Sequence, residues 1–502
     1  MVCWWLAWVV LVSGARAFCP RGCSCDDSGP SLRCVGVGIN VVPTLVNPGL
    51  RSLNLAHNSI SSVSHTLVYF AQLEELDFSH NLLASLGSRN FQKQVKLREL
   101  RLAHNNLSSL SVEALLGLTS LSVLDLSHNA ISDLPPDVLM NAPDLKVLLL
   151  AHNKLHTLFQ HTFRGPSSLH VLDLCDNYFR HVPTAAVEEL RALKTLQLCR
   201  NRLTQLESNA LCLPSLQALS LETNNIDYVA DASFSCLQRL TKLNLNDNLL
   251  REVPSAALVS LVLLESLHLS RNKIRSLEGG AFRGLGRLTT LEVSRCPLLS
   301  LLHPAALAEC FNLRELTLSH NPLVKHIPPG FLSSLPRLRS LDLRANGLRS
   351  FPSSEVSLRS RVSLDLRDNP MVCNCSLQWL AEELGAANRS LQAPDLQCAA
   401  PDKLRGVYLS RLTTGELDCV VRLKVVLGIV FCVVFVVCLI LCLVFCGYRR
   451  RRQRDKLMGR GWPPGPLAPW PPDDHAAATR HIMADDYGYH AYSVRHVPVT
   501  KV

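Results

Sequence analysis

The nineteen cysteines of this chain are the residues whose chemistry is most evident from the sequence. Eight of them form two groups: Cys19-x3-Cys23-x-Cys25-x8-Cys34, and Cys373-x-Cys375 followed by Cys398 and Cys419. Neither group has histidines at zinc-ligand spacing, and cysteines of exported proteins oxidise. We therefore expect disulfides in both groups, although spacing alone does not fix their connectivity.

Histidines form a second regularly spaced set of functional side chains near the N-terminal end. They recur every 23 or 24 residues, at His57, His80, His104, His128 and His152. If neighbouring rings lie one strand apart, protonation below about pH 6.5 makes them repel one another. The alternative is that Ser-His-Asn and Ala-His-Asn are common sequences at this position of the repeat, where each histidine forms only local hydrogen bonds.

A repeated pattern positions both sets of residues. The template L-x-x-L-x-L-x-x-N-x-L occurs in 14 copies over residues 50–371, spaced 23 to 25 residues apart, and the last copy is degenerate. Its fourth and sixth positions are two apart, so in a strand they point the same way. One repeat cannot bury that face alone, whereas stacked repeats bury a continuous core behind parallel strands. The asparagine can satisfy backbone groups where the chain leaves the strand.

The repeat register predicts which internal cysteines can meet. Cys175 and Cys199 share position 7 of consecutive repeats, and Cys212 and Cys236 both precede the next repeat by four residues. Each pair should be stacked roughly 5 Å apart, which fits either a disulfide or two free thiols. Cys296 and Cys310 fall in apolar slots and are predicted to be buried thiols.

The 14 repeats between two cysteine clusters resemble the extracellular leucine-rich repeat receptors with N- and C-terminal caps and a single transmembrane segment. The resemblance implies an α/β-type leucine-rich repeat solenoid, a parallel-sheet horseshoe with a mostly irregular convex side. It also implies the four cap disulfides Cys19–Cys25, Cys23–Cys34, Cys373–Cys398 and Cys375–Cys419. Members act in adhesion, guidance, growth-factor control and innate recognition, and the fold does not choose among these.

Composition divides the chain into segments. Residues 2–12 are apolar and precede Ala15-Arg16-Ala17, which is typical of a cleaved signal peptide. The apolar run 425–446 is long enough to span a membrane, and the basic residues after it favour a cytoplasmic C-terminus and the plasma membrane. We expect a signal peptide (1–17), an N-terminal cap (18–49), repeats (50–371), a C-terminal cap (372–419), a transmembrane helix (425–447) and a disordered tail (448–502).

The concave strand face is the predicted ligand site. Position 3 or 5 of repeats four to six carries an apolar run among charged residues, which suits an interface core, although β-branched residues also simply favour strands. The candidate residues are Arg101, Val123, Asp125, Val147, Leu149, Val171 and Asp173. Glycosylation sequons stand at Asn106, Asn388 and, between two cap cysteines, Asn374.

The tail offers docking motifs rather than a folded domain. Pro463 and Pro466 form a P-x-x-P of the kind that SH3 domains bind, in an extended proline-rich segment. Thr500 and Val502 fit a class I PDZ ligand, whose terminal carboxylate is bound in a backbone nest. Tyr487, Tyr489 and Tyr492 are candidate phosphotyrosines, and residues 488–492 loosely resemble the tail of trophoblast-glycoprotein-like receptors.

The leading hypothesis from the sequence is a cell-surface recognition or adhesion receptor that binds a protein ligand and recruits a PDZ scaffold. The rival is an auxiliary subunit or co-receptor that binds a channel or receptor in the same membrane. An enzyme is disfavoured because no nucleophile, metal or phosphate motif stands out. The sequence suggests no cofactor. The net charge of +10 needs no nucleic-acid partner, because half of it lies in the tail beside the stop-transfer cluster.

Overall fold

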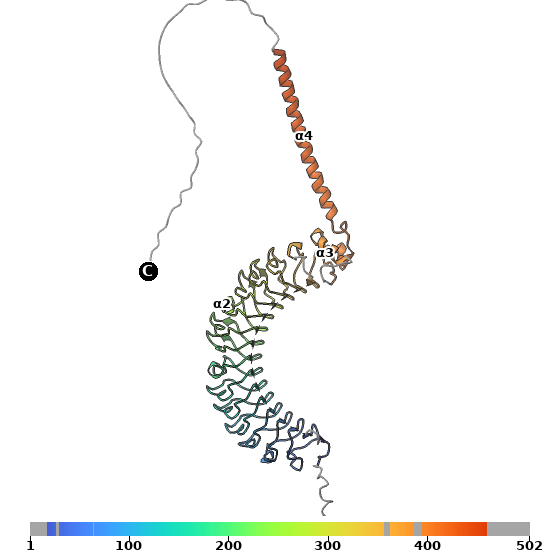
Figure 1. Ribbon diagram of the computed structural model, residues 1–502. Helices are drawn as coiled ribbons and strands as arrows, with labels where there is room; N and C mark the ends of the chain where they lie inside the picture. The colour runs from blue at the N-terminus through green and yellow to red at the C-terminus, as the bar shows by residue number, and fades with distance from the viewer. Residues whose placement is uncertain (1–17, 27–29, 64, 356–361, 386–393, 459–502) are drawn as a thin grey trace, which may run out of the picture. The chain divides into compact units, whose positions relative to one another are not determined.

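The computed structural model describes residues 18–26, 30–63, 65–355, 362–385 and 394–458. The predicted signal peptide and the tail from residue 459 onward lie outside these residues. The repeats form a curved solenoid with its strands along the concave side (Figure 1). The predicted leucine-rich repeat horseshoe is therefore confirmed.

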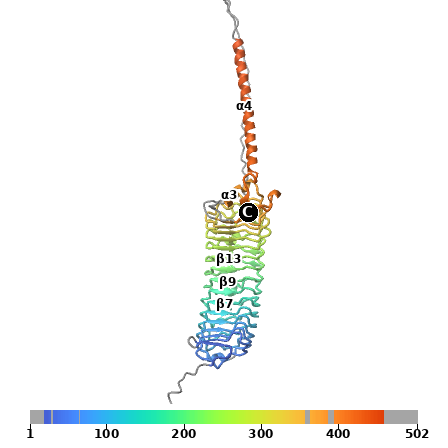
Figure 2. The ribbon, with the colours of Figure 1, turned by 90° about the vertical axis from the view of Figure 1, so that its right-hand side faces the viewer.

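One 16-stranded sheet runs through the solenoid, and its successive turns stack as parallel rungs (Figure 2). It opens with β1 (Ser24–Asp26) antiparallel to β2 (Ser31–Arg33), and every later pairing is parallel. Each of the 14 predicted repeats contributes one three-residue strand. These strands are β3 (Ser52–Asn54), β4 (Glu75–Asp77), β5 (Glu99–Arg101), β6 (Val123–Asp125), β7 (Val147–Leu149), β8 (Val171–Asp173), β9 (Thr195–Gln197), β11 (Ala218–Ser220), β13 (Lys242–Asn244), β14 (Ser266–His268), β16 (Thr290–Glu292), β18 (Glu315–Thr317), β19 (Ser340–Asp342) and β20 (Ser363–Asp365).

The core is a stack of leucines behind this sheet. The register places Leu124 beside Leu148, and Leu148 beside Leu172, so each repeat's fourth position covers that of the next. All three side chains are buried, as are Phe234 and Phe282 on the convex side. Burial is shared between turns, which explains why no repeat is stable without neighbours.

The repeat asparagines join consecutive turns. The Asn153 amide donates to the carbonyl of Leu126 in the preceding turn at 3.0 Å, and to Leu150 in its own turn at 3.1 Å. Its Oδ1 accepts from the Ile131 amide at 3.0 Å. One buried side chain therefore satisfies both donors and acceptors where two turns leave their strands.

The convex side holds short elements between irregular segments. Two small parallel sheets lie there, β10 (Gln205–Leu206) with β12 (Tyr228–Val229), and β15 (Ser276–Leu277) with β17 (Leu301–Leu302). The helical segments in the described parts of the repeats are η1 (His65–Tyr69), α1 (Thr184–Val187), α2 (Ser255–Leu258) and η2 (Ser353–Glu355).

The C-terminal cap closes the last turn of the solenoid. It contains η3 (Cys375–Leu377), α3 (Gln378–Gly385), η4 (Asp402–Leu404) and η5 (Leu409–Arg411). The indole of Trp379 donates to the Phe351 carbonyl at 3.2 Å, and the two rings lie 6.3 Å apart. An aromatic pair thus covers the end of the leucine core, which an open solenoid would expose.

One helix, α4 (Cys419–Met458), contains the apolar run, and within the described residues it alone is long and apolar enough to cross a membrane. The prediction of a disordered tail from residue 448 was wrong for its first part, because α4 continues to Met458. Arginine, glutamine, lysine and leucine follow the span, and these residues favour helix. Single glycines at 459 and 461 come only afterwards.

Candidate ligand-binding site

An apolar patch lies on the concave face, where the sequence places it. The register sets Val123, Val147 and Val171 side by side, and Leu149 between Asp125 and Asp173. We refer to Val123, Val147, Leu149 and Val171 as the apolar patch. All four side chains are half-buried rather than fully exposed as expected, since neighbouring strands cover one another's flanks.

The negative charges of the carboxylates around the apolar patch are not neutralised by cationic side chains of the described residues. Asp125 accepts from the Ser127 amide and Asp173 from the Cys175 amide, each at 2.9 Å. In the part of the chain that the structure describes, Asp77, Asp125 and Asp173 make no ion pair. Burial raises the pKa of Asp173, against the opposing effect of its backbone hydrogen bond. A cation supplied by a ligand would therefore find unneutralised partners here.

Arg101 behaves differently from the other predicted site residues. Its guanidinium lies 2.6 Å from Glu99 on the same strand, β5. Both side chains remain accessible, so this pair contributes little to stability. It does neutralise Arg101, which leaves the surrounding acidic charge in excess.

The five histidines form a continuous stack along one edge of the concave face. Ring centroids of consecutive residues from His57 to His152 are 4.0 to 4.1 Å apart, and the planes deviate by only 10 to 14°. Each of these residues has a positive φ, and each backbone amide donates to the following turn, as from His104 to the Ser127 carbonyl. The same left-handed turn is therefore repeated at each level, and it aligns the rings.

The stack disfavours protonation of its own members. The pKa values of His80, His104 and His128 are lowered, first by burial and then by neighbouring imidazoles. Asp125 opposes this effect on His104 and His128. The stack favours the ring–ring hypothesis over purely local bonding, and the lowered pKa values of His80, His104 and His128 favour uncharged rings at these three positions at neutral pH.

The C-terminal half of the concave face is internally paired. Arg344 contacts Asp342 at 3.1 Å, and Arg367 contacts Asp365 at 2.6 Å and lowers the pKa of that carboxyl. A polar groove of about 470 Å³ lies within this half, and its walls include Arg271, Glu292, Arg295 and His320. The charged side chains of this groove either have partners within the chain or are of mixed sign. The groove therefore does not favour a ligand of one charge.

Three residues of this half make the contacts of a serine–histidine–acid triad. Ser266 Oγ lies 2.8 Å from His268 Nε2, and His268 Nδ1 lies 2.8 Å from Glu292 Oε2. This cluster was not predicted from the sequence, because its members come from two strands, β14 and β16. The Ser266 amide already donates to the Thr241 carbonyl, so it is not available to stabilise an oxyanion. The cluster instead orients Glu292, whose pKa is lowered by the contact with His268.

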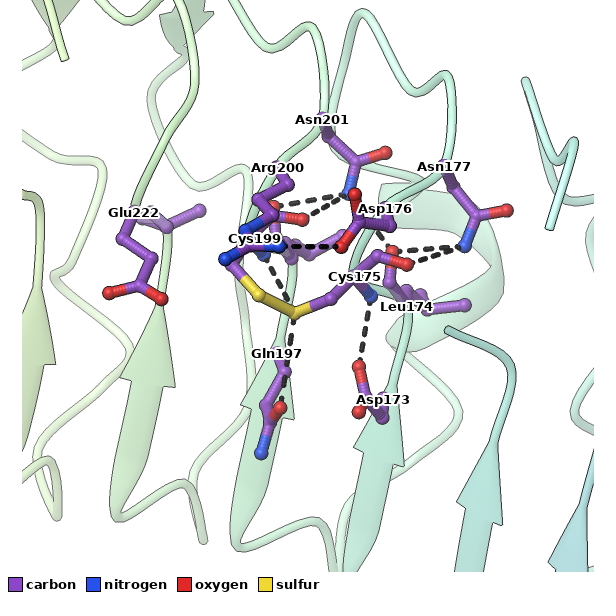
Figure 3. The surroundings of a disulfide bond; sticks show 12 residues. Asp173, Leu174, Cys175, Asp176, Asn177, Gln197, Cys199, Arg200, Asn201 and Glu222 are labelled. Atoms are coloured by element: carbon purple, nitrogen blue, oxygen red, sulfur yellow. Dashed lines mark hydrogen bonds and ion pairs between the residues drawn. A yellow bond between two sulfur atoms is a disulfide. The ribbon is translucent and has the colours of Figure 1, made fainter. Parts of the chain in front are cut away.

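Six disulfides join twelve of the cysteines, and they are the four cap pairs and the two internal pairs considered above. Cys175 and Cys199 lie beside Gln197, Asp176 and Arg200 at the concave edge (Figure 3). Their Cα atoms are 4.6 Å apart, the separation that the stacked register produces. This bond fastens β8 to β9 next to the end of the histidine stack.

The second internal disulfide and the free thiols lie elsewhere. Cys212 and Cys236 join the turn of β9 to the next turn, that of β11, with Cα atoms 4.9 Å apart. Cys296 and Cys310 are free and buried, as predicted, and burial raises their pKa to about 11 and about 12. Such thiols are inert packing residues rather than nucleophiles.

An apolar hollow of about 490 Å³ that the sequence did not suggest lies between repeats five and six, on the segments that follow Asn153 and Asn177. Tyr178 stands at its wall, with the Arg202 guanidinium 4.5 Å from the ring centroid and the His156 ring 5.2 Å away. The cation–π contact fixes the tyrosine.

The predicted modification sites differ in their surroundings. Asn106 is exposed, which is compatible with a glycan. The Asn374 side chain caps η3 by accepting from the Ser376 amide at 2.9 Å and hydroxyl at 2.7 Å, so its amide is held in place. Asn388, Thr500 and Val502, together with the three candidate phosphotyrosines and the SH3 motif, lie outside the described residues.

Curated relatives share the repeats with this chain. A fibronectin type III domain-containing leucine-rich repeat protein, "1-like", of Danio rerio is 31% identical over 121 residues, 22% of this chain and 16% of its own. Leucine-rich repeat transmembrane protein FLRT2 of Rattus norvegicus is 28% identical, over 24% of this chain and 18% of its own. The chain therefore aligns with a fifth or less of these relatives' length. No relative tests the trophoblast-glycoprotein resemblance.

Solved structures agree on the fold. A TLR13–ssRNA13 complex matches with a TM-score of 0.65 and 27% identity, covering 70% of this chain and 52% of that one. The LRIM1/APL1C complex matches with a TM-score of 0.57 and 21% identity, covering 87% and 80%. These solved structures share the curved solenoid fold with this chain, and the relative FLRT2 is a leucine-rich repeat transmembrane protein.

The family follows from the repeats themselves. The family model described as "Leucine rich repeat" matches six overlapping segments, residues 95–155, 143–197, 191–250, 238–298, 263–323 and 311–371. Together these cover more than half of the chain. The chain thus belongs to the leucine-rich repeat family.

Proposed function

We propose that this protein is a plasma-membrane recognition or adhesion receptor of type I topology, and that strands β4 to β8 bind an extracellular protein ligand. The observation that carries the proposal is the apolar patch among unpaired carboxylates, Asp77, Asp125 and Asp173. Such a surface is suited to a macromolecular interface with an apolar centre and a charged rim. The acidic excess opposes the phosphate backbone of a nucleic acid.

The topology rests on the residues that flank the span. Four consecutive arginines begin at Arg449, within α4. Basic residues next to a membrane helix stay cytoplasmic, so the repeats face outward. The six disulfides fit an oxidising, extracellular location for the repeats.

The test uses the full-length chain on cells and a panel of secreted ectodomains as baits. Leu149→Asp places a charge in the patch, and we expect binding of the recovered bait to weaken by about 30-fold or more, which corresponds to about 2 kcal/mol for a hot spot. Ser220→Asp is the matched control, because Ser220 occupies the same strand position in β11. Equal binding by both variants at equal surface levels would move the site away from β4 to β8.

The tail completes the proposal as a scaffold-recruiting segment. Thr500 and Val502 would occupy a PDZ domain, Pro463 and Pro466 an SH3 domain, and Tyr487, Tyr489 and Tyr492 would be kinase substrates. A tail peptide should bind a PDZ panel only while Val502 is terminal. Undiminished binding after one added residue would show that the carboxylate is not recognised.

A second candidate function is an auxiliary subunit that binds partners in the same membrane. It is favoured by the five residues between Cys419, which closes the cap, and Val425, which begins the apolar run. So short a spacer gives neighbours in the same membrane a high effective concentration. A 40-residue Gly/Ser insertion after Cys419 should remove partners that depend on this tethering. Retained membrane partners, with cell aggregation appearing only after insertion, would favour adhesion instead.

A further inference from the structure

We infer that the concave face of β4 to β8 binds a cationic, apolar segment of its partner and releases it on acidification, through the adjacent histidine stack. The inference rests on the proposed function of this face and names the chemistry of its ligand. Three features carry it: the apolar patch, the charge of the strands, and the position of the stack.

Charge selects the kind of partner. Strands β4 to β8 carry five carboxylates and one guanidinium, a formal charge of −4. The guanidinium of Arg101 is already bound to Glu99, so it does not neutralise the others. Leu149 lies between Asp125 and Asp173, which places an apolar contact between two anionic ones. A strand-like segment that alternates lysine or arginine with apolar residues matches this surface.

The C-terminal half shows that the arrangement is not a general property of the repeats. Of the four carboxylates on strands β9 to β20, those of Glu292, Asp342 and Asp365 are held by His268, Arg344 and Arg367. Those acids have partners within the chain. The acids of β4, β6 and β8 have backbone or amide donors, which leaves their charge available to a ligand.

The histidine stack adjoins the same strands and can reverse their charge. Its rings are 4.0 to 4.1 Å apart, so each proton added lies close to the last. The charged groups that face the stack are Asp77 on β4, Asp125 on β6, and Asp173 and Asp176 next to His152. Asp176 is shared with Arg200 at 3.6 Å. Full protonation would add five positive charges against these four carboxylates and abolish the attraction for a cation.

Protons and a cationic segment therefore compete for one surface. Binding of the segment stabilises the uncharged stack, and protonation of the stack weakens binding by the same factor. The lowered pKa values of His80, His104 and His128 place the transition below pH 6.5. The partner would stay bound at the pH of the cell exterior and dissociate in an acidified vesicle.

The test uses the full-length chain in zwitterionic phosphatidylcholine nanodiscs. The probe is a peptide of about eight residues that alternates lysine and leucine, long enough to cross five strands. Matched peptides replace lysine with glutamate, or leucine with serine. We expect the Lys/Leu peptide to bind most tightly at about pH 7.4 and at least about tenfold more weakly at about pH 5.5.

The decisive variant is His80→Asn with His104→Asn and His128→Asn. Asparagine tolerates the positive φ of these positions, 54 to 56°, and does not titrate in this range. In this variant the dissociation constant of the Lys/Leu peptide at about pH 5.5 should exceed that at about pH 7.4 by less than about threefold. An unchanged ratio would overturn the role of the stack, and equal binding of the Glu/Leu peptide would overturn the choice of a cationic partner.

The proposed function and this inference fail in different ways. If a protein bait binds in a Leu149-dependent manner but the Lys/Leu peptide does not compete with it, the face is a ligand site and the inference is wrong. If the peptide binds Leu149→Asp as well as the unaltered chain, its binding is not at the apolar patch, and the inference is again overturned. If the peptide competes with the bait at about pH 7.4 and much more weakly at about pH 5.5, both stand.

Discussion

The two halves of the concave face share one backbone but differ in how their charges are satisfied. In β9 to β20 three of the four acids are paired within the chain, as in the contact of Asp365 with Arg367 at 2.6 Å. In β4 to β8 Asp125 and Asp173 keep their charge beside half-buried valines and a leucine. The asparagine bonds are nevertheless the same on both sides, as Asn153 and Asn272 show.

This difference separates stability from recognition. The leucine core and the asparagines need nothing from outside, so they can be identical in every repeat. Strand positions 3 and 5 do not contribute to the core and are free to vary. Where these positions carry charges that pair within the chain, a ligand gains little by binding. Where they carry unpaired charges beside apolar side chains, a ligand can form new ion pairs and apolar contacts.

The largest expected effect concerns the bond at the boundary between the halves. Replacing Cys175 and Cys199 with serine removes a cross-link that spans 24 residues, and we expect a loss of about 3 kcal/mol in the stability of the neighbouring turns. Denaturant unfolding followed by hydrogen exchange at β8 and β9 measures it. Serine replacement of Cys212 and Cys236 removes a cross-link that also spans 24 residues, between the turn of β9 and the turn of β11, and should cost a similar amount. No loss at β8 and β9 would mean that the native residues are thiols.

A smaller effect tests whether the framework is the same in both halves. Asn153→Ala and Asn272→Ala each leave the carbonyls of two turns without their donor, and we expect each to cost about 2 kcal/mol. Local hydrogen exchange compares the two variants, with the exposed Asn106→Ala as a control that should change little. A difference of more than about 1 kcal/mol between the two sites would show that the halves differ in scaffold as well as in surface.

The sequence predicted the scaffold more fully than the surface, for a physical reason. Leucine spacing determines which side chains share a face, so the 14 concave strands of the repeats and the buried thiols Cys296 and Cys310 could be anticipated, whereas the convex strands β10, β12, β15 and β17 were not. The repeat register also predicted that Cys175 lies beside Cys199, and Cys212 beside Cys236, but it did not decide between disulfides and free thiols. Contacts that depend on side-chain direction were not predictable, as in the cluster of Ser266, His268 and Glu292.

The histidine stack shows where the limit lies. Its period was evident in the sequence, and adjacent rings were one of two open alternatives. The ring contact itself depends on the left-handed turn at position 8, which occurs in all 14 repeats, including those with Asp247 or Arg295 at this position. After His152 this position holds unlike residues in the next repeats, such as Asp176, Arg200 and Thr223, and the rings stack where five histidines occupy it in consecutive repeats.

The smallest expected effect follows from that stack and contrasts the halves by pH. The pKa values of His80, His104 and His128 lie below 6.5 in the folded chain, so between that value and the lowered ones the unfolded chain binds more protons. Their contribution to stability is therefore complete above pH 6.5 and declines as the pH falls through this range. In the other half the lowered pKa of Glu292 preserves its contribution until the pH falls below about 4.5.

Between about pH 6.5 and 5, the turns of β4 to β6 should loosen while β14 and β16 do not. The rings are exposed, so solvent screens their repulsion and the change should be small. Hydrogen exchange, corrected for the intrinsic pH dependence of the chemical step, resolves the two regions in one experiment. The triple asparagine variant of His80, His104 and His128 should lose the difference, because nothing at those positions then titrates. Equal loosening of β16 in the unaltered chain would show that the effect comes from the net charge of the protein. The two halves would then differ in surface chemistry, and the histidine stack would not make one half more sensitive to pH than the other.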